Sequence, residues 1–198
     1  MSIRSALLSA VLAAPLLTPG AVAAAPATYA IDPDHVVVSF TVMHAGYART
    51  LGVFTDVAGE FTYDADTQEL GEVSVTIGAA SVNTFHEARD GHVRSPDFLD
   101  AEANPQITFV ASGGEAASDT SGTVTGDLTI RGVTQPVTLD VTLNQNAVYP
   151  CCHGKETLGI SATASILRSD FGSTYALPVF VGDEVDITLE FEAIMQDG

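Results

Sequence analysis

The chain has 198 residues, a formal net charge of −18 and 46% hydrophobic residues, and only 16% of its residues are charged. Seven Lys and Arg stand against 25 Asp and Glu, so a nucleic-acid partner is disfavoured because phosphates repel such a chain. The apolar content is too high for a disordered acidic tail, and no apolar run reaches the roughly 18 residues that predict a transmembrane segment. The composition predicts one cored domain with an acidic surface.

Residues 1–24 have the three-part layout of a secretory signal peptide. Arg4 is the one cation of a short first region, residues 6–17 are apolar, and Pro19-Gly20 precedes a run of small residues that ends at Ala25. The apolar region is too short to span a bilayer. We therefore expect export through a cleavable signal, a periplasmic location and a mature domain of residues 25–198.

Alternation of apolar and polar residues is the dominant pattern after the signal. It is regular over residues 36–42 and 137–143, and it is typical of strands that bury one face. Eight strands are expected, at about residues 36–44, 57–63, 72–79, 106–112, 121–131, 136–147, 157–167 and 184–194. Because each has one apolar face, the strands can close into an up-and-down antiparallel barrel that leaves no exposed edge. The sequence thus predicts an all-β fold.

Two features interrupt or separate these strands. Residues 85–103 lack alternation and predict a short helix and a loop between the third and fourth strands. Turn-forming residues at 64–67, 112–114, 131–134 and 181–183 separate several of the strands. No internal repeat or linker indicates a second domain.

The segment Arg89-Asp90-Gly91-His92 places a cation, an anion and a titratable ring within four residues. Such a group could hold a polar head group at a barrel mouth, and a local ion pair with a helix cap is the alternative. His44 shares the strand parity of the residues at 40 and 42, so we expect it to point inward near the strand end. The five His have no metal-binding spacing, and no metal or catalytic residue is assigned.

Cys151-Cys152-His153 contains both thiols of the chain. Neighbouring Cα atoms lie about 3.8 Å apart, closer than the roughly 4.4–6.8 Å of ordinary disulfides, so a bridge between the two would be strained. In an oxidising compartment the pair could form that bridge, an intermolecular bridge or a soft-metal site with His153, or could stay free.

Several short motifs follow one another along the mature chain. They occupy residues 29–35, 59–61, 80–84, 89–92, 95–99, 105–109, 126–134, 168–172 and 181–185. In this order, from Tyr29 to about Ala193, the chain resembles the YceI family of secreted bacterial polyisoprenoid-binding, lipocalin-like proteins. Tyr29 and Ser173 depart from the family pattern, which often has Trp at the first position and Met or Leu at the second. We expect both to affect packing around the cavity mouth.

The resemblance implies an eight-stranded antiparallel lipocalin-like barrel with no catalytic machinery and no required cofactor. The interior would hold a long apolar chain, such as an isoprenoid quinone, a polyprenyl lipid or a fatty amide. Periodicity equally fits a barrel filled by its own side chains. The resemblance, and not the spacing, favours a cavity.

Strand parity and position supply the candidate ligand-binding residues. The apolar candidates are Phe40, Val42, Phe61, Val75, Ile77, Ile107, Phe109, Leu128, Ile130, Leu139, Val141, Ile166 and Ile187. The polar candidates for orienting a head group are His44, Arg89, Asp90 and His92, with Arg168 and Asp170 as a second set.

Three functions remain open from the sequence. The first is a periplasmic lipid-binding protein that stores, shields or transports an isoprenoid lipid or quinone. The second is an enzyme whose histidines and Asp90 act as acid and base on a lipid head group, and the third is a redox or metal accessory protein that uses Cys151-Cys152-His153. A homodimer, a membrane-protein or cytochrome partner, and the chain length and head group of the ligand also stay open.

Overall fold

Strands dominate the computed structural model, which describes residues 26–197. The signal peptide expected at residues 1–24 lies outside the described residues. The strands are β1 (Ala27–His44), β2 (Ala48–Phe54), β3 (Val57–Asp64), β4 (Glu69–Gly78), β5 (Val82–Asn83), β6 (Gln106–Ala111), β7 (Glu115–Ser118), β8 (Ser121–Ile130), β9 (Val133–Val148), β10 (Glu156–Leu167) and β11 (Val181–Met195). The helical elements are α1 (Glu87–Arg94) and the 3-10 turns η1 (Ala79–Ser81) and η2 (Arg168–Phe171).

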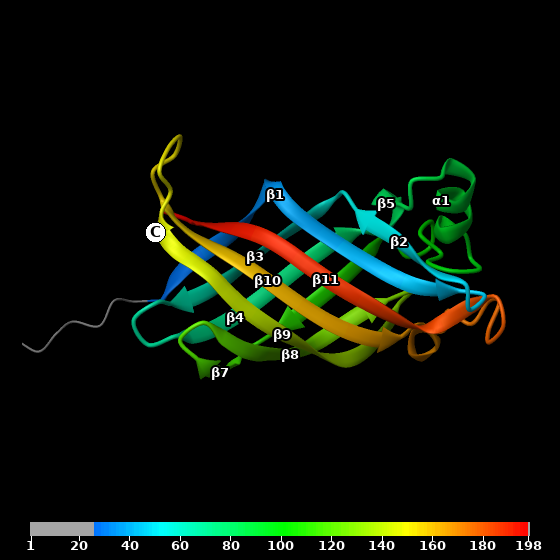
Figure 1. Ribbon diagram of the computed structural model, residues 1–198. Helices are drawn as coiled ribbons and strands as arrows, with labels where there is room; N and C mark the ends of the chain where they lie inside the picture. The colour runs from blue at the N-terminus through cyan, green and yellow to red at the C-terminus, as the bar shows by residue number, and fades with distance from the viewer. Residues whose placement is uncertain (1–25, 198) are drawn as a thin grey trace, which may run out of the picture.

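The long strand β1 closes the sheet into a barrel (Figure 1). One of its edges pairs antiparallel with β11, and the other pairs with β3 near the start of β1 and with β2 near its end. From β3 the order continues through β4, β6, β8, β9 and β10 to β11. β2 and β3 pair with successive parts of the same edge of β1 and together act as one strand of the barrel. The result is the predicted closed eight-stranded antiparallel barrel, in which the main strands have no free edge.

Each predicted strand range overlaps one of β1, β3, β4, β6, β8, β9, β10 and β11, and α1 lies in the predicted helix and loop region. The turn predicted at residues 181–183 is wrong, because these residues begin β11 and Val181 pairs with His44 of β1. The sequence pattern did not predict β2, β5, β7 or the first half of β1. Within residues 26–197 no helix combines the length and apolar character that crossing a membrane requires.

An aromatic cluster fills the end of the barrel away from α1. The rings of Tyr29 and Phe61 stack with their centroids 5.7 Å apart, and Tyr63 packs edge-on against Tyr29. The Tyr29 hydroxyl donates a hydrogen bond to Glu156 Oε1 at 2.8 Å. Burial, together with this carboxylate, raises the pKa of the Tyr29 phenol well above its usual range.

The cluster corrects one sequence expectation, that Tyr29 packs around the cavity mouth. Tyr29 lies near the beginning of β1, whereas His44 lies at its other end, beside the elements that surround the mouth described below. Tyr29 therefore helps to close the opposite end of the barrel, together with buried Leu158 and Ala193.

Candidate ligand-binding cavity

A cavity of about 550 Å³ occupies the barrel interior. Its wall is mainly apolar and follows strand parity, so that Val36, Val38, Phe40 and Val42 of β1 all line it. The volume falls within the roughly 300–1,000 Å³ that is usual for small-molecule sites. The inward side chains therefore surround a hollow and do not fill a solid core.

The cavity wall brings together most of the residues that sequence analysis selected. Those that line it are Phe40, Val42, His44, Phe61, Val75, Ile77, Arg89, His92, Ile107, Phe109, Leu128, Ile130, Leu139, Val141, Ile166, Arg168 and Ile187. Asp90 and Asp170 do not line it. Contact between these lining residues and a ligand stays a prediction.

The cavity opens at the end of the barrel that carries α1. Lining side chains that are also exposed to solvent are His44, Arg89, His92, Tyr175 and Phe180, and all of them lie at this end. We call these five residues the cavity mouth. The aromatic cluster lies at the other end, which we call the closed end.

Arg89 and Asp90 of α1 both bind Thr84. Arg89 Nε donates to Thr84 Oγ1 at 2.8 Å, and its Nη2 donates to the Thr84 carbonyl at 2.6 Å. Asp90 Oδ1 accepts from the Thr84 hydroxyl at 2.5 Å and from the Thr84 N–H at 2.6 Å, and these bonds help to lower the pKa of the Asp90 carboxyl. Asp90 is thus buried against Thr84 and anchors α1, whereas Arg89 keeps further N–H groups for the mouth.

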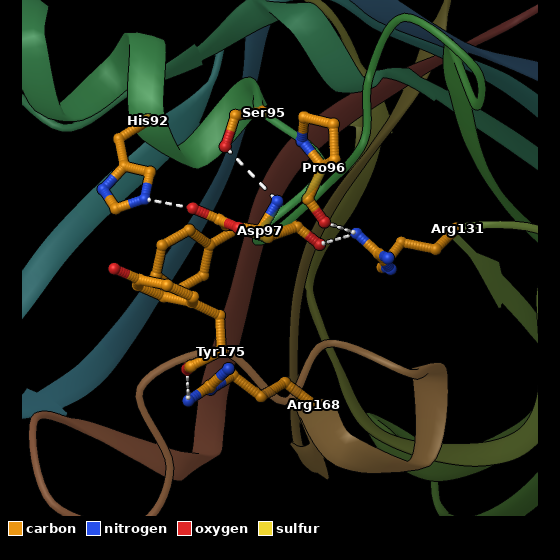
Figure 2. A network of polar contacts seen from close by, with 8 residues as sticks. His92, Ser95, Pro96, Asp97, Arg131, Arg168 and Tyr175 are labelled. Carbon is orange, nitrogen blue, oxygen red and sulfur yellow. Dashed lines mark hydrogen bonds and ion pairs between the residues drawn. The ribbon is translucent and has the colours of Figure 1, made fainter.

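His92 links α1 to the loop before β11 (Figure 2). Its Nε2 lies 2.9 Å from Asp97 Oδ2. The imidazole packs edge-on against Phe98 and Tyr175, with centroid distances of 5.0 and 5.2 Å. The ring is therefore held at the mouth by one hydrogen bond and two aromatic contacts, and its Nδ1 is available for a further bond.

Arg168 is buried and is held by backbone carbonyls. Its guanidinium donates to Ser173 O at 2.6 Å, Gly182 O at 2.8 Å, Tyr175 O at 2.9 Å and Val181 O at 3.0 Å. These bonds use four of the five N–H donors of an arginine. Burial lowers the pKa of Arg168, but an arginine stays protonated. Arg168 therefore fixes the loop of residues 173–180 to the start of β11 and has little capacity left for a head group.

The second acidic candidate is also outside the cavity wall. Asp170 lies in η2 and is exposed, and its backbone carbonyl accepts a hydrogen bond from Gln135 Nε2 at 3.2 Å. Strand parity gave no guidance here because residues 168–171 leave the strand and form a 3-10 turn.

The two cysteines lie in the hairpin between β9 and β10, at the closed end of the barrel. Cys151 and Cys152 are free and exposed. A hydrogen bond with the Cys152 thiol is the main factor that raises the pKa of Cys151, so less of the reactive thiolate forms. Beside them Tyr149 and His153 stack with their centroids 4.7 Å apart. None of these residues lines the cavity.

Asp32, His35 and Glu192 form a group whose ligand atoms all lie within 4.8 Å of one another, as a metal site would require. His35 Nδ1 is 2.8 Å from Asp32 Oδ2 and 3.8 Å from Glu192 Oε2. Sequence spacing could not reveal this group, because Glu192 comes from β11 and the other two from β1. None of the three lines the cavity.

Comparison with known proteins decides the family. The YceI-like domain matches residues 29–193. The chain belongs to the YceI-like domain family. A UPF0312 protein of Pseudomonas putida (strain W619) is 35% identical over 172 residues, which cover 86% of this chain and 88% of that protein.

Solved structures share the fold of this YceI-like domain. BcnA from Burkholderia cenocepacia superposes with a TM-score of 0.73 at 28% identity, covering 82% of this chain and 98% of that one. A polyisoprenoid binding domain from Saccharophagus degradans has a TM-score of 0.61 at 15% identity, covering 85% and 98% of the two chains. The resemblance stated from the sequence motifs is therefore confirmed, both in family and in fold.

Proposed function

We propose that this YceI-like barrel binds a long apolar chain, such as the isoprenoid tail of a quinone or a polyprenyl lipid, and stores, shields or transports it in the periplasm. The observation that carries the proposal is the apolar cavity of about 550 Å³, whose solvent-exposed lining residues all lie at the end that carries α1. Each buried CH₂ contributes about 0.8 kcal/mol, so such a chain needs few polar contacts. The polyisoprenoid binding domain of Saccharophagus degradans, which shares the fold, supports the same class of ligand.

The mouth supplies the few polar groups that would orient a head group. Arg89 and His92 both line the cavity and are exposed there, and each keeps nitrogen atoms that are not used in the contacts described above. Donors of this kind match the oxygen atoms of a quinone or of a polyprenyl phosphate. We therefore propose that the head group lies between α1 and the loop of residues 173–180.

We favour binding over catalysis. An acid–base pair of Asp90 with a mouth histidine needs the carboxylate in the cavity, but Asp90 is buried against Thr84 and is absent from the cavity wall. The redox or metal role for Cys151-Cys152-His153 is less well supported, because this hairpin lies at the closed end and none of the three residues lines the cavity.

The test is the lipid content of the exported protein. The mature protein should be purified from a periplasmic fraction without added lipid, and its chloroform extract examined by mass spectrometry. The proposal predicts about one apolar lipid per protein, and rebinding of an isoprenoid quinone after delipidation. Absence of stoichiometric lipid together with no rebinding would refute it. Turnover of a lipid that is lost in His44→Ala and His92→Ala variants, with binding retained, would instead support the enzyme.

A further inference from the structure

Large hydrophobic side chains stand in solvent around the cavity mouth. Their exposed fractions are 91% for Tyr47, 70% for Phe85, 65% for Val179 and 63% for Phe180. We call these four residues the apolar rim. They come from the β1–β2 turn, the segment before α1 and the loop before β11, which lie together at one end of the barrel in Figure 1.

Contacts join the three segments that carry the apolar rim. The Ala45 N–H in the β1–β2 turn donates to the Phe180 carbonyl at 2.8 Å. The loop that contains Phe180 reaches α1 through the Tyr175 and His92 rings, whose centroids are 5.2 Å apart. The rim is therefore one connected border of the mouth and not a set of separate loops.

Phe85 is held outward by its backbone. Its φ is +63°, a conformation that is uncommon for a bulky residue. The Phe85 N–H donates to Asn83 Oδ1 at 2.8 Å, and the preceding carbonyl, that of Thr84, accepts from Arg89. Strained residues of this kind concentrate at functional sites, where the surrounding structure keeps them in place.

The apolar rim is continuous with the cavity wall. Phe180 belongs to both, since it lines the cavity and is exposed to solvent. An apolar chain that leaves a membrane loses hydrophobic burial for every methylene that crosses water. If the apolar rim touches the hydrocarbon of a bilayer, an apolar chain can pass between the membrane and the cavity without crossing water.

The cations are gathered at the same end. Among residues 26–197 there are six Lys and Arg, and all but Lys155 lie at the mouth end: Arg49, Arg89, Arg94, Arg131 and Arg168. The formal charge of the whole chain is −18, so the acidic excess is least compensated at the closed end. Arg49 pairs with Asp186 and Glu184, and Arg168 is buried. The cations therefore make the mouth end less acidic than the closed end, so it is the end that a membrane surface repels least.

We infer that the apolar rim inserts into the head-group region of a lipid bilayer and aligns the cavity mouth with the hydrocarbon. The inference rests on the proposed function, because it names where the ligand enters and leaves. Aromatic and aliphatic side chains beside polar groups suit the membrane interface. A second copy of the chain is a less suitable partner for the apolar rim. Two such acidic molecules repel each other, and two rims packed together would seal both cavities.

The test is flotation of the mature protein with vesicles of phosphatidylcholine alone. Val179→Ser should lower the vesicle-bound fraction about fivefold. Val148→Ser is the matched control. Val148 is 66% exposed, close to the 65% of Val179, but lies at the closed end, so its variant should bind as the wild type does. Neither valine lines the cavity. Tyr47→Ser repeats the test if Val179→Ser melts at a lower temperature than the control.

Three results would overturn the inference. They are absence of wild-type flotation, equal effects of the two valine substitutions, and a dimer in sedimentation that Val179→Ser dissociates while vesicles bind nothing. An Ala164→Phe variant, which fills the cavity, separates the inference from the proposed function, because it should float although it carries no lipid. If lipid co-purifies with the wild type but the protein does not float with vesicles, only the membrane docking is refuted. If the wild type floats but contains no bound lipid, only the proposed function is refuted.

Discussion

Phe40 on β1 stands opposite Gly52 on β2, and a Cβ atom at position 52 would come within 2.3 Å of Phe40 Cζ. The glycine therefore leaves the space in which the aromatic ring lies along the cavity wall. Phe54, on the same side of β2, packs against that ring with a centroid distance of 5.6 Å. A cross-strand pair of this kind fixes both the shape of the cavity and the register of β2.

Gly52→Ala should force the Phe40 ring into the cavity. Overpacking of this kind costs about 1–3 kcal/mol of unfolding free energy, and the reduced volume should weaken quinone binding. Urea unfolding and a quinone titration measure the two effects. Gly91→Ala is the control, because a Cβ atom there meets nothing within 4 Å and alanine favours the helix. Wild-type stability and affinity in Gly52→Ala would show that the ring has room to move elsewhere.

Arg168→Met should destabilise the protein by about 3 kcal/mol, because it leaves buried carbonyls without a donor. The carbonyls of Ser173, Tyr175, Val181 and Gly182 would all lose their partner. Arg168→Lys should not restore stability, since an ammonium cannot reproduce the planar set of donors. Chemical denaturation of both variants tests this, and full rescue by lysine would contradict the role assigned to the guanidinium.

The Asp32–His35 pair predicts a pH dependence. The hydrogen bond with Asp32 raises the pKa of His35 above its ordinary value, so the folded state favours the protonated ring. The resulting stabilisation is complete below about pH 6.5, the usual value of an unfolded histidine, and is lost as the pH rises through the folded pKa. For Asp32, partial burial opposes the shift, but hydrogen bonds from His35 and the Asp34 N–H outweigh it and lower the pKa.

NMR titration of His35 checks this account in the wild type and in Asp32→Asn. The pKa of His35 should fall toward its ordinary value in the variant. The stability difference between the two proteins should shrink as the pH rises from about 5.5 to about 8. An unchanged His35 pKa in Asp32→Asn would show that Glu192 or another group is the effective partner.

The sequence predicted those parts of the fold that depend on alternation. Strand parity placed Phe40, Val42 and His44 on one face, and all three line the cavity. It missed β2, because Thr50 and Gly52 occupy inward positions and break the apolar pattern; the register there is set by β1. Local pattern alone therefore finds a strand only when its inward residues are apolar.

The polar groups of the site were harder to predict, because their roles depend on partners. Asp90 was expected at the mouth, but the conformation of the preceding turn brings Thr84 onto its carboxylate. Arg168 directly follows β10 and lines the cavity, yet its donors are taken by the backbone of the following segment. Composition and residue spacing alone do not predict such hydrogen bonds.

The most direct test of the central claim compares two substitutions on β10. Ala164 lines the cavity opposite Ile187, whereas its neighbour Thr163 is exposed on the outer face. Phenylalanine at 164 should occupy the space of the ligand, and phenylalanine at 163 should not.

The measurement is moles of lipid per mole of protein in chloroform extracts of the wild type, Ala164→Phe and Thr163→Phe, each shown to be folded by circular dichroism. We predict about one lipid in the wild type and in Thr163→Phe, and almost none in Ala164→Phe. Equal lipid in all three folded proteins, or none in the wild type, would contradict a ligand held in the barrel cavity.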